Sequence, residues 1–151
     1  MTALEQRHSF LKKNKIGICD IVEYCERSKV DASDLGMLNI TLRNLIGILD
    51  EHKTVETILF MGWNSKNGPE YLFRKLLKTH DIKLDILDNG APRIHTFKIK
   101  QRDIQTVSLI SPSNAANRSI GANVQYKTLK LENKNYTTLD FRINQYRKYF
   151  D

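Results

Sequence analysis

The sequence predicts an α/β fold with three layers, in which helices cover both faces of a mainly parallel central sheet. Short apolar runs rich in β-branched residues alternate along the chain with longer amphipathic segments, which is the pattern of this α/β/α sandwich. The length of 151 residues and the hydrophobic content of 40% suit one core. We therefore expect a single domain over residues 1–151.

Hydrophobic periodicity places the individual elements. Apolar residues three and four positions apart indicate helices, and alternating or continuous apolar runs indicate strands. The predicted helices cover residues 4–14, 41–49, 70–80 and 139–150, and the predicted strands cover residues 15–22, 56–61, 82–87, 94–100 and 104–110. The pair Ser111-Pro112 ends the last strand, because proline cannot continue a central strand.

Two of these elements carry expectations about burial. Residues 15–22 read as a buried strand with a single acid, Asp20, and Cys19 is expected to be a small core residue. The last helix is expected to place one apolar face, formed by Leu139, Ile143, Tyr146 and Phe150, along one side.

Composition excludes several classes of protein. No apolar run approaches the roughly 20 residues that cross a bilayer, and no signal peptide is visible, so we expect a cytoplasmic protein. Two cysteines and four scattered histidines show no metal-ligand spacing, so we expect no metal, no cofactor and no disulfide. No serine lies in a nucleophile elbow.

The net charge of +7 is unevenly distributed. Residues 1–92 hold 13 Lys and Arg against 13 Asp and Glu, whereas residues 93–151 hold 11 against 4, which is an excess of 7. Such an asymmetry predicts either a polyanionic partner for the C-terminal part or a solvated basic surface.

Three places are candidate binding sites, because ligands of α/β sheets gather at the carboxyl ends of the strands. They are Asp20, the turn at residues 62–68, and the loop at residues 111–118. The loop is rich in hydroxyl, amide and guanidinium groups that suit phosphate and base contacts. Each place also has a structural interpretation: Asp20 as a cap, the turn as a glycine-eased entry to a helix, and Ser113 or Asn114 as the start of the next helix.

The ordered set of these segments resembles the uracil-DNA glycosylase superfamily, especially its bacterial uracil-DNA glycosylase-like members. The stretches that carry the resemblance are IGICDIVE at residues 16–23, LFMGWNSKNG at 59–68, LISPS with ANR at 109–118, and DFRINQY at 140–146. The resemblance implies a protein of DNA base-excision repair, which flips uracil or a similar deaminated base from the duplex and hydrolyses its N-glycosidic bond.

The resemblance also implies roles for individual residues. Asp20 and Asn64 would border the base pocket. The residues that would contact DNA are Lys66, Ser111, Pro112, Ser113, Asn114, Asn117 and Arg118. The loop at residues 111–118 matches the motif that pinches phosphates and enters the minor groove.

No residue before Ile16 matches the family's first motif, which carries the group that positions the attacking water. We therefore expect either an N-terminally incomplete chain or a shortened relative, and the catalytic residue is unknown. Three functions follow: a glycosylase, a DNA-binding module without the chemistry, or a fragment that needs a partner. The partner would be DNA, or a second chain that pairs with an exposed sheet edge.

Overall fold

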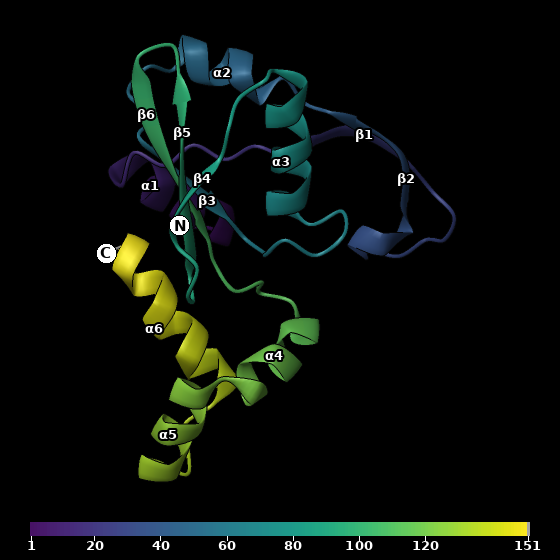
Figure 1. Ribbon diagram of the computed structural model, residues 1–151. Coiled ribbons are helices and arrows are strands. Elements are labelled where there is room, and N and C mark those ends of the chain that lie inside the picture. Colours follow the sequence, from purple (N-terminus) through teal and green to yellow (C-terminus); the bar gives the residue numbers. More distant parts are fainter. Residues whose placement is uncertain (151) are drawn as a thin grey trace.

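The computed structural model describes residues 1–150 and is a mixed α/β fold (Figure 1). The helices are α1 (Ala3–Lys13), α2 (Leu45–Glu51), α3 (Pro69–Thr79), α4 (Asn117–Ala122), α5 (Val124–Glu132) and α6 (Thr138–Phe150). The strands are β1 (Val22–Arg27), β2 (Met37–Leu42), β3 (Thr57–Phe60), β4 (Asp85–Asp88), β5 (Arg93–Ile99) and β6 (Arg102–Ser108). Two short 3-10 helices are η1 (Asp34–Gly36) and η2 (Asn114–Ala116).

The central sheet has the order β3-β6-β5-β4 and is mostly antiparallel. Only β3 and β6 run parallel, while β5 pairs antiparallel with both β6 and β4. The expectation of a mainly parallel sheet is therefore wrong. The connections between β4, β5 and β6 are only a few residues long, and connections of that length join antiparallel strands, whereas a parallel pair needs a long crossover.

Helix α3 covers one face of the sheet and forms the main core with it. Phe73 of α3 is fully buried, and its ring lies 5.3 Å from the ring of Phe97 and 5.1 Å from that of Phe60. Each side chain of this size contributes about 1.5–3 kcal/mol when it is buried. This packing fixes the position of α3, and therefore of the turn that precedes it, on the sheet.

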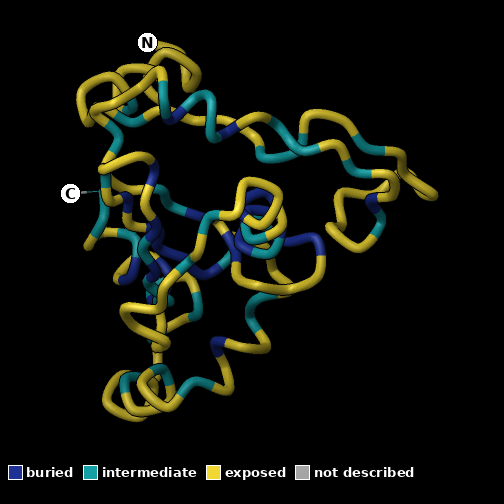
Figure 2. The backbone as a smooth tube through the Cα atoms, turned by 45° about the horizontal axis from the view of Figure 1, so that its top comes forward, coloured by how far each residue is buried: buried dark blue, intermediate teal, exposed yellow. Residues whose placement is uncertain are grey.

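The N-terminal part of the chain differs from its prediction. Helix α1 forms where expected, with Thr2 and Glu5 in a capping box and Asn14 at its C-cap, but it has no buried residue. Residues 15–21 are not a strand: the side chain of Ile18 is 78% exposed, and Cys19 is exposed too. The chain pairs only from Val22, in the β1–β2 hairpin, which projects from the body as a largely exposed ribbon (Figure 2). The apolar character of residues 15–21 did not reveal that no strand within residues 1–150 pairs with them.

Helix α6 has nearly the predicted bounds but buries another face. Its buried residues are Phe141, Arg142 and Gln145, whereas Leu139 is 60% exposed. Two of these three buried residues are polar, which is why the apolar periodicity failed to identify the face. Helices α4, α5 and α6 enclose a second, smaller hydrophobic cluster around Ile110, Ile120 and Phe141.

Candidate nucleic-acid interface

Two of the three predicted places, the turn at residues 62–68 and the loop at residues 111–118, lie at the same end of the central sheet. Because β3 and β6 are parallel, with Phe60 opposite Ser108, their carboxyl ends coincide. The turn at residues 62–68 follows β3, and the loop at residues 111–118 follows β6. In Figure 1 both segments leave the sheet at its lower end. The parallel pair is thus the feature of the fold that starts both segments at the same end of the sheet.

The loop at residues 111–118 is held from behind by Arg142 of α6. The guanidinium Nε donates to the carbonyl of Ser111 (3.0 Å), and Nη2 donates to the carbonyl of Ser113 (2.8 Å) and to Oδ1 of Asn117 (2.6 Å). Arg142 is 7% exposed. One charged side chain therefore fixes three points of the loop, and hydrogen bonds to a charged donor are stronger than neutral ones.

The start of this loop is fixed by the next turn of the same helix. Gln145 Oε1 accepts a hydrogen bond from the amide of Ile110 (2.8 Å), and the hydroxyl of Tyr146 donates to the Ile110 carbonyl. Burial raises the pKa of the Tyr146 hydroxyl, so it remains a donor at neutral pH. Helix α6 thus orders the chain from Ile110 onward.

Within the loop, the serine hydroxyls satisfy the backbone. Ser111 Oγ accepts from the amide of Ser113 (3.2 Å), and Ser113 Oγ accepts from the amide of Ala115 (3.2 Å). Ser113 is the N-cap of η2, so the structural interpretation of this residue is confirmed. Pro112 is exposed. The side chains of Asn114 and Arg118 are exposed, and no hydrogen bond or ion pair within residues 1–150 occupies them.

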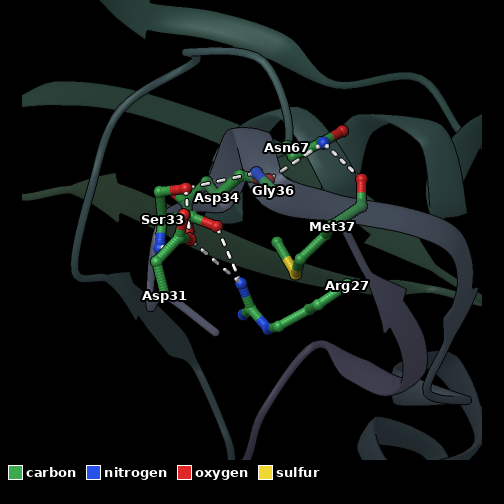
Figure 3. Close-up of polar contacts among 7 residues, drawn as sticks. All are labelled: Arg27, Asp31, Ser33, Asp34, Gly36, Met37 and Asn67. Atoms are coloured by element: carbon green, nitrogen blue, oxygen red, sulfur yellow. Dashed lines mark hydrogen bonds and ion pairs between the residues drawn. The ribbon is translucent and has the colours of Figure 1, made fainter. Parts of the chain in front are cut away.

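The turn at residues 62–68 is tightly wound and anchors the hairpin. A Cβ at Gly68 would lie 2.7 Å from the Trp63 carbonyl oxygen, so only glycine fits there. Asn67 has a φ of 61° and donates from Nδ2 to the carbonyls of Asp34 (3.1 Å) and Met37 (3.4 Å), as Figure 3 shows. Asn64 and Lys66, the predicted pocket and DNA contacts, are both exposed.

The third predicted residue, Asp20, lies in the extended segment before β1. It is exposed, and its backbone carbonyl accepts a hydrogen bond from Nε of Arg43 (2.9 Å). Among residues 1–150, no hydrogen bond or ion pair joins the Asp20 carboxylate to Asn64 or to the loop at residues 111–118.

A buried ionic network lies at this end of the sheet, between α3 and the strands. The sequence did not reveal it. Glu70, in the first turn of α3, is fully buried. Its Oε1 accepts from Arg74 Nε (2.9 Å) and from Arg93 Nη2 (3.1 Å), and its Oε2 accepts from Ser108 Oγ (2.8 Å). The network joins α3 to the paired ends of β5 and β6, where Arg93 lies opposite Ser108.

His95 extends this network along the sheet. Its Nε2 lies 2.8 Å from Nη2 of Arg74, which is always a donor, so Nε2 accepts and the neutral ring carries its proton on Nδ1. Burial lowers the pKa of His95, an effect that the charge of Glu70 opposes only in part. His95 Nδ1 and Oγ1 of Thr106, its cross-strand neighbour, are buried and have no hydrogen-bond partner.

Some of the basic side chains in residues 93–150 form hydrogen bonds or ion pairs within the protein, and others have no such partner. Arg102 donates to the carbonyls of Leu49, His52, Lys53 and Val55 at the end of α2, and Lys100 pairs with Asp50. Within residues 1–150, no hydrogen bond or ion pair engages the side chains of Arg118, Lys127, Lys134 or Lys148. The first three of these lie in the segment that forms α4, α5 and the chain directly after them.

Other kinds of site receive no support from the part of the chain that the structure describes. No three of its His, Cys, Asp and Glu side chains are grouped so as to hold a metal ion, and none of its helices has the length and apolar character to cross a membrane. A hollow of about 510 Å³ is lined by residues 27–32 of the hairpin loop. Another of about 330 Å³, at the far end of α3, is lined by Arg74, residues 77–78 and residues 81–84.

Comparison with known proteins gives no match: no family model, no curated protein and no solved structure is significantly similar to this chain.

Proposed function

We propose that this protein binds DNA through the loop at residues 111–118, as a uracil-DNA glycosylase-like relative whose surviving activity is recognition of the DNA backbone. One observation carries the proposal: Arg142 holds the loop at three points while the side chains of Asn114 and Arg118 stay exposed. A loop whose backbone is already fixed loses little conformational entropy when it binds, so its exposed groups are prepared for a ligand.

The distribution of charge supports a polyanionic ligand. Arg118 belongs to the loop, Lys66 lies on the neighbouring turn, and Lys127 follows on α5. All three side chains are free of internal partners. Lys and Arg contacts to phosphates release counterions and supply the sequence-independent part of DNA affinity.

Binding to labelled duplexes tests this function. Fluorescence anisotropy, measured between about 50 and 200 mM salt, should show an affinity whose logarithm falls linearly with the logarithm of the salt concentration, with a slope of about 0.9 for each neutralised phosphate. An affinity that does not change with salt, or no binding at 50 mM salt, would contradict the proposal.

A second arm measures base excision, which the resemblance implies. The protein is incubated with a duplex that contains one uracil, and alkali then cleaves any abasic site. Because Asp20 and Asn64 are exposed and not joined to one another, we expect no cleavage above background. Cleavage at the uracil would show that the protein is a glycosylase and would replace the proposed binding module by an enzyme.

A further inference from the structure

The two edges of the central sheet are protected to different degrees. The edge strand β4 carries Asp85 and Asp88, and its pairing with β5 is irregular between Ile86 and Asp88. Charges and bulges are the features that stop an edge from pairing with another chain. The opposite edge strand, β3, has the sequence TILF without a charge, and its register with β6 is regular from Thr57 to Phe60.

The outer side of β3 carries unpaired backbone groups. The amide of Gln105 donates to the Glu56 carbonyl (2.9 Å), and the amide of Leu109 donates to the Phe60 carbonyl (2.8 Å). Residues 56, 58 and 60 therefore face β6, because the backbone groups of successive strand residues point to opposite sides. Thr57 and Leu59 face outward, and within residues 1–150 no hydrogen bond engages their N–H or C=O groups.

We propose that β3 pairs with β3 of a second copy of this chain, antiparallel and about a two-fold axis at Ile58. In this alignment Thr57 lies opposite Leu59 of the partner subunit and Leu59 lies opposite Thr57 of the partner subunit. The two pairs exchange four N–H···O bonds and use every unpaired group on this side of β3. The arrangement is self-complementary and closed, so it yields a dimer and not a fibre.

Charge favours a second copy as the occupant of this edge. No residue of β3 is charged, so no like charges within the two strands face each other across the two-fold axis at Ile58. Met61 (41% exposed) and Trp63 (36% exposed) directly follow the strand and add apolar surface. Because the strand has only four residues, the interface is small and the dimer is weak.

The oligomeric state of the full chain tests this proposal. In sedimentation equilibrium the mean mass should rise from one chain toward two as the protein concentration increases from about 10 µM to about 1 mM, the range of weak interfaces. In the same range, hydrogen exchange of a peptide that contains Leu59 should slow, because its amide becomes bonded. A mass of one chain at every concentration would overturn the proposal.

Two variants locate the interface. Thr57→Pro removes an outward N–H at the first residue of an edge strand, where proline is tolerated, and should keep the chain monomeric with an unchanged circular dichroism spectrum. Thr57→Lys leaves the backbone intact and places two like charges across the two-fold axis, so its dissociation constant should rise at least tenfold. Ile86→Lys on β4 is the matched control and should dimerise like the parent chain. A dimer that persists in both Thr57 variants would exclude β3 as the interface.

Discussion

Arg142 and Asn117 lie 25 residues apart in sequence, and their side chains meet at 2.6 Å, behind the loop that follows β6. The same guanidinium also holds the carbonyls of Ser111 and Ser113. The residue that shapes the candidate interface is thus a buried cation on another helix, and it does not need to touch the ligand.

Replacing Arg142 by lysine should weaken DNA binding although the charge is kept. A lysine ammonium cannot reproduce the planar fork that reaches three acceptors, so the loop loses its fixed shape. We expect at least a tenfold loss of affinity, measured by anisotropy, and a loss of about 1–3 kcal/mol in the free energy of unfolding. Lys148→Arg on the same helix is the control and should change neither quantity. Parent-like affinity of the Arg142→Lys chain would show that the clamp is irrelevant to binding.

Replacing Glu70 by glutamine should destabilise the protein strongly. The fully buried carboxylate accepts hydrogen bonds from two guanidinium groups and one hydroxyl, and removal of its charge leaves the half-buried Arg74 and Arg93 without their counter-charge. The loss of these buried hydrogen bonds costs about 1–3 kcal/mol. Urea unfolding measures it, with Glu26→Gln on the exposed hairpin as a control that should stay within about 0.5 kcal/mol. A Glu70 variant as stable as that control would contradict the network.

The free energy of unfolding should fall as the pH decreases below about 6.5, the ordinary pKa of histidine. Because burial lowers the pKa of His95 in the folded state, the unfolded chain binds a proton first. The stabilisation is complete above pH 6.5 and is lost as the pH falls from there toward the lowered pKa. In His95→Asn, urea unfolding at pH 7.5 and 5.5 should give a smaller difference than in the parent chain. His80→Asn, at an exposed position, should retain the parent difference.

Replacing Asn67 by glycine should release the β1–β2 hairpin without disturbing α3. Glycine accepts the φ of 61°, so the turn is kept, but the two hydrogen bonds to Asp34 and Met37 are lost. We expect faster hydrogen exchange in residues 34–42 and no change in residues 69–79. Unchanged exchange in the hairpin would mean that other contacts hold it in place.

Much of the fold follows from local patterns. Helix α3 and strands β3, β5 and β6 form close to their predicted bounds, because their periodicity is strong and glycine, proline or tight turns delimit them. The direction of the strands was not predicted correctly. The short connections on both sides of β5 indicate antiparallel strands. The alternation of strands and helices nevertheless led to the expectation of a parallel sheet.

The candidate site was predictable only in part. The loop at residues 111–118 could be located because a Ser-Pro pair ends a buried strand, and in the structure it starts at the same end of the sheet as the turn at residues 62–68. Arg142 and Glu70 could not be found from the sequence. Arg142 contacts residues at least 25 positions away, and Glu70 contacts Arg93 and Ser108 in addition to Arg74 on its own helix. In the sequence alone, a charge in a helical pattern looks like a solvated side chain.

Comparing the salt dependence of DNA binding in Arg118→Ala and in the parent chain shows whether the loop at residues 111–118 contacts the DNA. If the loop contacts the DNA backbone, the slope of log affinity against log salt should decrease by about 0.9, because one phosphate contact is lost. Lys78→Ala, which removes the same charge at the far end of α3, should leave the slope unchanged. An unchanged slope in Arg118→Ala, or an equal change in both variants, would contradict the assignment of the loop as the DNA-binding element.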